Sequence, residues 1–282
     1  MLPSKYIFGL LALVTITIWL AVLAAPDDRL RLIACDVGQG DAMLVVYGQS
    51  QILIDGGPDG SVLDCLASHM PFWDRRIELV ILTHPQTDHF RGLIEVFRRY
   101  KVDVFLTLPL NSSTSAYQVL KNEVGGSKAR VVNATAGKVI RLGLIQLDIV
   151  HPTKNFLAGA NTSSGDPNDF SIVAILSFGE FEALLTGDIG PKVTPDILAT
   201  GKIRDVEYIK IPHHGSKNGL TKELLEASMP EVAVISVGKN PWGHPHKEVL
   251  TLLEEYGVKI KRTDLEGDIE VVTDGEVWWL KD

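Results

Sequence analysis

Three short segments hold six of the eight histidines of the chain, and each is rich in groups that bind metal ions. They cover residues 84–89 (His-Pro-Gln-Thr-Asp-His), 212–216 (Pro-His-His-Gly-Ser) and 243–246 (Gly-His-Pro-His). A Thr-Gly-Asp run that ends at Asp188 adds a carboxylate between the first two segments. Imidazole and carboxylate are the ligands of divalent cations such as Zn, Mn and Fe. The residue types therefore predict a metal centre.

The elements that must position these groups are short apolar runs typical of buried strands. The runs cover 79–83, 183–186, 206–211 and 232–237 and are rich in Val, Ile and Leu. A buried strand that delivers a side chain just past its end can bring ligands from distant parts of the sequence to one point. The pattern predicts four strand ends aimed at one site. Helical periodicity is expected over 61–69, 90–100, 116–124, 221–227 and 247–256.

Two of the segments also have purely structural interpretations. Asp88 could cap the helix predicted over 90–100, and the Pro-His-His-Gly segment could be a tight turn in which Gly215 takes a positive φ. Each interpretation is reasonable for its own segment. Both are disfavoured because all the histidine segments and Asp188 occur in one chain.

Seven motifs carry a family resemblance when they are considered together and in order. They are DVGQGD at 36–41, LIDGG at 53–57, THPQTDH at 83–89, NDFS at 168–171, LLTGD at 184–188, PHHGS at 212–216 and GHP at 243–245. The chain resembles the metallo-β-lactamase superfamily, specifically the soluble hydrolase domain of ComEC-type DNA-uptake proteins. The resemblance covers nearly everything after residue 30. It implies a four-layer αββα sandwich over residues 30–282, a length suited to one α/β domain, with the site along one sheet edge.

The resemblance also implies a metal site for one or two divalent ions, Mn, Mg or Zn. The implied ligands are His84, Asp88, His89, Asp188 and His244. The chain departs from the family motif His-x-His-x-Asp-His at Gln86, and Asn168 stands where the family has a further histidine. The first metal position therefore keeps only His84 and Asp188. Because Asp88, His89, Asp188 and His244 can complete a second position, we expect one well-held and one weakly held ion.

Three residues are expected to act in catalysis: Asp88, His213 and His214. A bound cation would polarise a phosphoryl oxygen and lower the pKa of its water from about 15.7 toward about 7. His213 or His214 would then be the acid for the leaving oxygen or would hold the phosphate, and the sequence does not separate the two. Residues outside the ligand set are expected to support it through hydrogen bonds. They are Asp36, Asp41, Asp55, Gln86 and Asn168.

The remaining histidines and the two cysteines carry weaker signals. We expect His69, His151 and His246 at the surface or at helix ends. Cys35 and Cys65 have apolar neighbours, which favours buried free thiols, although a location outside the cytoplasm would permit a disulfide.

The charge of the chain limits how it could hold DNA. A net charge of -8 argues against a broad basic surface of the kind found on nucleic-acid-binding proteins. Lysines nevertheless flank the histidine motifs. They are Lys210, Lys217, Lys239 and Lys247. A local basic rim of this kind would suffice for weak, salt-sensitive contact with a strand.

The first 26 residues form a separate segment that bears on localisation. Residues 7–25 carry no charge, Lys5 precedes them, and Asp27 and Asp28 follow. A stretch close to the roughly 20 residues that span a bilayer favours a retained membrane anchor over a signal peptide. The flanking charges favour a domain outside the cytoplasm. The alternative is secretion after cleavage near Ala24 or Ala25.

These observations lead to one leading functional hypothesis and one alternative. The first is a membrane-tethered or exported metal-dependent phosphodiesterase, a nuclease that acts on DNA in connection with uptake, with a separate DNA-uptake channel as a further partner. The alternative is a metal-poor, non-catalytic protein on the same fold that binds a strand or a protein partner. Activity on a lactam or a small ester is disfavoured, because the resemblance points to ComEC-type proteins.

Overall fold

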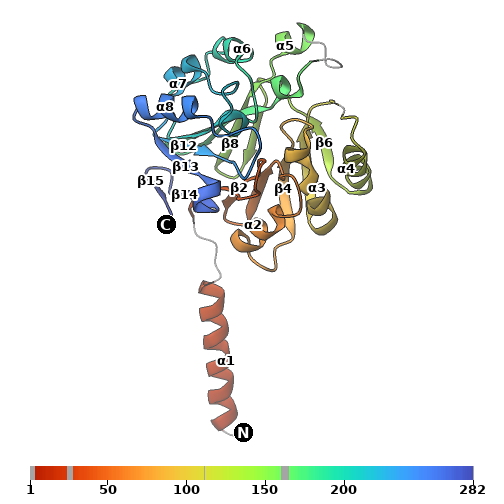
Figure 1. Ribbon diagram of the computed structural model, residues 1–282. Helices are drawn as coiled ribbons and strands as arrows, with labels where there is room; N and C mark the ends of the chain where they lie inside the picture. Colours follow the sequence, from red (N-terminus) through yellow and green to blue (C-terminus); the bar gives the residue numbers. More distant parts are fainter. Residues whose placement is uncertain (1–3, 24–27, 111, 160–164, 282) are drawn as a thin grey trace.

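Two mixed β-sheets lie face to face in the computed structural model, which describes residues 4–23, 28–110, 112–159 and 165–281 (Figure 1). The first sheet has the strand order β15-β14-β1-β2-β3-β4-β5-β6 and the second β13-β12-β11-β10-β9-β8-β7. The first contains β1 (Leu30–Ala34), β2 (Met43–Tyr47), β3 (Ser50–Ile54), β4 (Arg76–Ile81), β5 (Lys101–Thr107), β6 (Arg130–Asn133), β14 (Ile269–Thr273) and β15 (Trp278–Leu280). The second contains β7 (Val139–Leu142), β8 (Ile145–His151), β9 (Val173–Phe178), β10 (Phe181–Leu185), β11 (Tyr208–Lys210), β12 (Val232–Ile235) and β13 (Lys259–Arg262).

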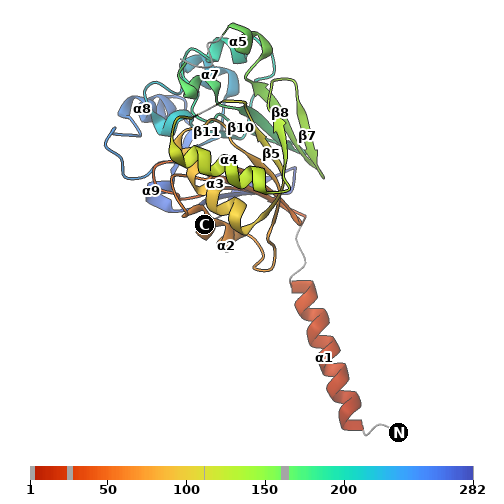
Figure 2. The same ribbon diagram turned by 90° about the vertical axis from the view of Figure 1, so that its right-hand side faces the viewer.

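Helices cover the outer faces of both sheets (Figures 1 and 2). The first sheet is covered by α2 (Val62–His69), α3 (Thr87–Arg99) and α4 (Ser115–Gly126). The second is covered by α6 (Thr194–Leu198), α7 (Lys222–Ser228) and α8 (Lys247–Glu255). Shorter elements are α5 (Lys154–Gly159), α9 (Thr263–Glu266) and the 3₁₀ turns η1 (Pro167–Phe170) and η2 (Pro212–Gly215). The helix–sheet–sheet–helix arrangement agrees with the α/β fold expected from the sequence.

Alternation along the strands builds three apolar cores. In β1, Leu32 packs between the two sheets, whereas its neighbour Ile33 packs under the helices of the first sheet. Successive side chains of a strand point to opposite faces, so a strand covered on both sides reads as a continuous apolar run. The run at 183–186 follows the same rule, since Ala183 joins the core between the sheets and Leu184 the core under α6 and α7. This double burial explains why the site-forming strands could be recognised.

Parallel pairing places the chemical loops at one edge. β3 pairs in parallel with β4 in the first sheet, and β10, β11 and β12 are parallel neighbours in the second. The loops at their carboxyl ends carry Asp55, His84, Asp188, His214 and the segment 236–246. Parallel strands end at the same edge of a sheet, so these loops are brought together there.

The N-terminal helix α1 (Ser4–Leu23) precedes the sheets. No helix in the described part of the chain is both long enough and apolar enough to cross a membrane. The cleavage positions considered above, Ala24 and Ala25, lie outside the described residues. Anchor and signal segment therefore both remain predictions.

The expectation of free thiols is wrong, because Cys35 and Cys65 form a disulfide that ties the end of β1 to α2. Their Cα atoms lie 5.8 Å apart. Both side chains are buried as expected. Burial among apolar neighbours does not distinguish a thiol from a disulfide, since either is found in such surroundings.

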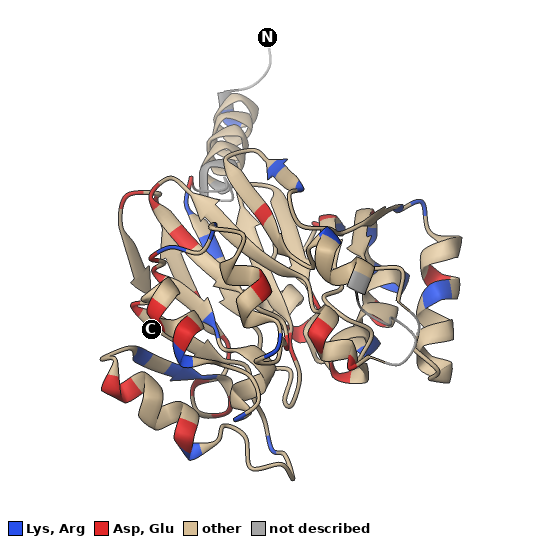
Figure 3. Ribbon diagram, turned by 90° about the horizontal axis from the view of Figure 1, so that it is seen from above, with Lys and Arg blue, Asp and Glu red and all other residues tan. Residues whose placement is uncertain are grey.

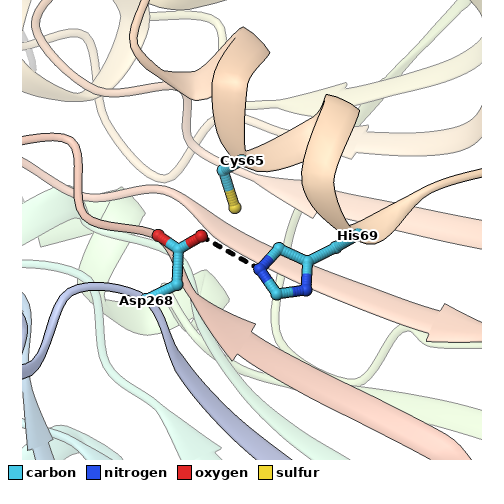
Figure 4. A group of neighbouring side chains, drawn as sticks. All are labelled: Cys65, His69 and Asp268. Atoms are coloured by element: carbon cyan, nitrogen blue, oxygen red, sulfur yellow. Dashed lines mark hydrogen bonds and ion pairs between the residues drawn. The ribbon is translucent and has the colours of Figure 1, made fainter.

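His69 is the last residue of α2, one turn beyond Cys65, so the expectation of a helix-end position is confirmed, and its ring pairs with carboxylates (Figure 4). Its Nε2 is 2.9 Å from Asp268 Oδ2 and its Nδ1 is 3.5 Å from Glu270 Oε2. Hydrogen bonds to these two carboxylates raise the pKa of His69 to about 9. The expectation of a surface or helix-end position is wrong for His151, the buried last residue of β8, whose Nε2 lies 2.9 Å from the carbonyl oxygen of Asp169. Cys65, His69 and Asp268 cluster closely, but the disulfide occupies the sulfur that a metal would need.

Candidate metal centre

The buried carboxylate of Asp188 is the point at which the site-forming loops meet. Its Oδ2 lies 3.2 Å from Nε2 of His89 and 3.3 Å from Nε2 of His214. Its Oδ1 accepts hydrogen bonds from Lys210 Nζ at 3.1 Å and from the backbone N–H of His213 at 3.2 Å. One carboxylate thus contacts groups from both sheets.

His89 is held with its Nε2 toward Asp188 by a chain of hydrogen bonds. Its Nδ1 lies 2.9 Å from Oδ2 of Asp55. Asp55 accepts from the backbone N–H of Thr83 at 2.8 Å and from the Thr83 hydroxyl at 2.7 Å. A carboxylate that fixes the far nitrogen of an imidazole is the usual support of a metal-binding histidine. Asp55 therefore has the geometry of a positioning residue.

His84 has a similar arrangement with hydroxyl partners. Its Nδ1 lies 3.1 Å from the hydroxyl of Thr83 and 3.2 Å from that of Ser171, and Ser171 also accepts from the backbone N–H of Asp188. Its Nε2 is buried and has no hydrogen-bond partner among the described residues. Burial, with the charge of His89, lowers the pKa of His84 to about 3. A neutral imidazole with an unpartnered nitrogen is suited to bind a cation.

His214 approaches the same point from η2. Its Nδ1 donates to the carbonyl oxygen of Ser236 at 2.8 Å, so the lone pair of a neutral ring lies on Nε2. That Nε2 is buried without a hydrogen-bond partner among the described residues, 3.4 Å from Oδ2 of Asp88. The backbone of His213 and His214 is left-handed, with φ 53° at both, which turns consecutive side chains in different directions. This turn leaves His214 buried and His213 partly exposed.

The donor set fits a divalent cation. Four groups of potential ligands overlap here, each with ligand atoms within 4.8 Å of one another. They are His84, His89 and Asp188; Asp88, His89 and His214; Asp41, Asp55 and His89; and Asp41, Asp188 and His214. Histidines fixed through Nδ1, with Nε2 atoms aimed at shared carboxylates, are typical of metal ligands. Because the groups share members, they could hold either one ion or two.

The buried charges of the site also favour a cation. Asp41, Asp55 and Asp188 are all buried, and Lys210 pairs with Asp41 and with Asp188. Burial by itself lowers the pKa of His89 and of His214. The carboxylates around them, Asp188 first, more than offset this and raise both pKa values well above the ordinary one. Without a metal the protons on these imidazoles balance the carboxylates, and a cation would replace those protons.

Lys210 is the residue whose role the sequence did not reveal. It was expected on an exposed basic rim, but it is buried in β11, and its Nζ also donates to the carbonyl oxygen of Gly187 at 2.9 Å. The signal was a single lysine inside the apolar run 206–211. Lys217, Lys239 and Lys247 are exposed as expected.

The loop before β2 brings Asp41 to the same site. The backbone N–H of Asp41 donates to the carbonyl oxygen of Asp88 at 3.2 Å. Gly40 permits this approach, because a Cβ there would collide with that carbonyl oxygen. Asp36 at the start of the loop is exposed, and its Oδ1 accepts from Gly38 N. Asp41 therefore contacts the site, whereas Asp36 serves its own loop.

Three further predicted residues lie around the ligand groups. Gln86 is partly exposed and lines the cleft described below. Asn168 is buried, and its Oδ1 has no hydrogen-bond partner among the described residues. The ring of His244 lies 5.8 Å from that of His213, and none of the ligand groups in the described part of the chain includes it. His214 thus occupies the place beside Asp88 and His89 that the sequence suggested for His244.

An open cleft of about 440 Å³ leads to this site. Its lining combines potential ligands with polar and aromatic side chains. The lining residues are Gln39, Gln86, Asp88, His213, His214, Ser216, Lys217, Asn218, Trp242, His244 and His246. A substrate in the cleft would therefore reach Asp88 and His214 directly.

Comparison with known proteins agrees with this geometry. The sequence profile of the metallo-beta-lactamase superfamily matches residues 35–239. The chain belongs to this superfamily. It is similar to recombination protein 2 of Haemophilus influenzae, with 28% identity over 94% of this chain and 31% of that protein. It is also similar to ComE operon protein 3 of Bacillus subtilis, with 27% identity over 83% of this chain and 32% of that protein.

Members of the superfamily share the fold at still lower identity. The structure of the metallo-beta-lactamase fold protein YhfI from Bacillus subtilis superposes with a TM-score of 0.59 at 9% identity, covering 88% of this chain and all of that one. The chain spans about a third of the length of the curated relatives it matches. It is thus related to competence and recombination proteins through this domain.

Replacing His89 by Ala should remove bound metal, because His89 belongs to three of the four ligand groups at the site. Purified full-length protein should lose most of its Zn or Mn, measured by elemental mass spectrometry. His69→Ala is the matched control, since His69 pairs with Asp268 and Glu270 instead. Equal metal content in the His89 variant and the parent protein would contradict the proposed site.

Replacing Lys210 by Met should destabilise the metal-free protein by about 3–5 kcal/mol, because it leaves buried carboxylates uncompensated. Addition of Mn or Zn should restore part of this loss, since a cation can balance the same charge. Urea unfolding with chelator and with metal measures both effects. Lys217→Met, at an exposed lysine, should change stability by about 0.5 kcal/mol or less. The idea fails if the Lys210 variant loses the same stability with and without metal.

Proposed function

We propose that this protein is a metal-dependent phosphodiesterase that acts on DNA in connection with its uptake. The observation that carries the proposal is the convergence of His84, His89 and His214 around the buried Asp188, beside an open cleft whose lining includes Asp88 and His214. A ligand set that adjoins an open cleft suits metal-assisted hydrolysis better than a closed structural site does.

The chemistry divides between the cation and the protein. When bound, a divalent cation supplies Lewis acidity toward a phosphoryl group and makes hydroxide available near neutral pH. Asp188 and Asp88 would hold it together with His89 and His214. His213 is partly exposed on the cleft wall, and Asp188 fixes its backbone N–H. It is therefore better placed than the buried His214 to donate a proton to the leaving oxygen or to contact the phosphate.

DNA as the substrate is supported by the relatives and by the local charge. The similar proteins carry the names recombination protein 2 and ComE operon protein 3. Acidic and basic residues are interspersed on the side shown in Figure 3. The net charge of -8 argues against a broad basic surface. Exposed Lys217 nevertheless lines the cleft, and Lys239 and Lys247 flank the lining segment 242–246 in the sequence. Contact with a strand would be local and salt-sensitive.

The alternative function is binding of a strand or a protein partner without turnover. It is favoured by Gln86 and Asn168, which stand where the family motif has histidines. The donors that are present still form four overlapping ligand groups, so we place hydrolysis first.

For the location, we propose that the uncharged stretch 7–25, which extends beyond the described end of α1, anchors the protein in a membrane. We further propose that the hydrolase domain lies outside the cytoplasm, beside a separate DNA-uptake channel. Apolar side chains of α1, among them Phe8, Leu10 and Trp19, are exposed. The disulfide between Cys35 and Cys65 supports an oxidising compartment, because such bonds are rare in the cytoplasm. Secretion after cleavage near Ala24 or Ala25 is the alternative.

Full-length protein in detergent should cleave DNA when supplied with Mn, Mg or Zn. Asp188→Asn should reduce the rate by about 100-fold or more, because Asp188 contacts both His89 and His214. Asp36→Asn is the control, since Asp36 is exposed and should leave the rate unchanged. Gel assays with labelled strands measure the rates. A parent protein that binds metal but cleaves no strand with any of the three ions would favour the non-catalytic alternative.

If the N-terminal segment is a retained anchor and the domain lies outside the cytoplasm, the mature protein should keep Lys5 and fractionate with membranes. Protease added to intact cells should then digest the domain. Mass spectrometry of the N-terminus decides between anchor and secretion, since a chain that begins at Ala25 or Pro26 has been cleaved. Complete protection in cells whose outer surface admits protease would exclude the external location.

A further inference from the structure

An exposed tryptophan on the cleft wall has no structural role that explains its position. Trp242 is 61% exposed and lines the cleft together with Asp88 and His214. Its ring stacks on that of His244, with centroids 6.1 Å apart and planes inclined by 30°. Exposure of a large aromatic side chain beside polar groups is typical of recognition surfaces.

The loop that carries Trp242 is rigid because of one side chain, that of Asn240. The Asn240 Nδ2 donates to the carbonyl oxygens of Gly238 and His244, both at 2.9 Å. Its Oδ1 accepts from the backbone N–H groups of Trp242 at 3.1 Å and His244 at 3.0 Å. The tryptophan is therefore held in place by its backbone while its ring stays open to solvent.

The same loop is joined to the turn that carries His213 and His214. The backbone N–H of His246 donates to the carbonyl oxygen of Gly215 at 2.9 Å. Pro245 packs so closely on Gly215 that a Cβ there would approach the Pro245 Cβ to 2.5 Å. The loop of Trp242 and the ligand turn are thus joined, and these contacts set the backbone position of Trp242 relative to the candidate metal centre.

The rest of the cleft offers partners for a phosphate backbone. Lys217, His213 and Asn218 lie on its lining and can donate hydrogen bonds to phosphate oxygens. A flat apolar ring beside such donors matches the chemistry of a nucleotide, whose base stacks and whose phosphate accepts.

We propose that Trp242 is the stacking platform for an unpaired base next to the phosphodiester bond that is cleaved. This inference rests on the proposed action on DNA and specifies that the DNA is single-stranded at the site. A base within a duplex has both faces covered by its neighbours, so a stacking platform favours single-stranded DNA. Trp242 then sets substrate preference, and the metal ligands set the chemistry.

Binding of a labelled single strand of roughly 12 nucleotides tests the proposal, since sites of about 4–16 nucleotides are usual. Fluorescence anisotropy with full-length protein in detergent and a chelator measures affinity without cleavage. Trp242→Ala should weaken binding by about 5- to 100-fold, because stacking is worth about 1–3 kcal/mol per base. Trp242→Phe should retain most of the affinity. Trp73→Ala is the matched control, because Trp73 is 58% exposed and does not line the cleft.

An abasic strand of the same length separates stacking from a general structural effect. Parent protein and Trp242→Ala should bind it equally. The proposal is overturned if the parent protein binds no single strand, or if Trp242→Ala binds the normal strand as tightly as the parent does. It is also overturned if Trp242→Ala loses as much affinity for the abasic strand or for duplex DNA as it loses for the normal single strand. Base-dependent binding without any cleavage would reject the phosphodiesterase and keep the platform. Cleavage that is indifferent to Trp242 would reject the platform alone.

Discussion

The balance of charge around Asp188 is the constraint on which the site depends. A carboxylate this deeply buried is stable only when cationic or hydrogen-bonding groups surround it. Lys210 supplies one such group from β11, and His89 and His214 supply two more from opposite sheets. Because these groups come from both sheets, the electrostatics of the centre also fix how the carboxyl ends of the strands meet.

The fold could be predicted from the sequence because its strands are buried on both faces. Double burial produces short apolar runs, and the helices carry one apolar face, so the periodicity expected over 90–100 and 247–256 matches α3 (Thr87–Arg99) and α8 (Lys247–Glu255) closely. The two cysteines were the failure in this part of the chain. Their apolar neighbours predicted burial correctly, but burial does not indicate whether the sulfur atoms are free thiols or form a disulfide.

The sequence predicted which loops form the site better than it predicted the role of each residue. The motifs identified the loops that meet, but His214, and not His244, lies with Asp88 and His89. Both residues follow strands and have another histidine within two positions, so the sequence pattern does not distinguish them. Which ring turns inward depends on the left-handed backbone at His213 and His214, a feature that spacing does not encode. Lys210 was predicted at the surface for a different reason. Its buried environment arises only when the two sheets pack together, and local sequence does not show this.

The buried ammonium group of Lys210 has a consequence for how the protein acquires its ion. In proteins whose folding free energy comes from the metal, the empty chain is unfolded and loading is tied to synthesis. Here an internal positive charge and the imidazole protons already satisfy the carboxylates, and three apolar cores hold the scaffold. A scaffold with these charges already paired would fold before an ion binds. An ion at the proposed centre would then exchange without unfolding, and the supply of metal in the compartment, more than the biogenesis of the chain, would decide which one is bound.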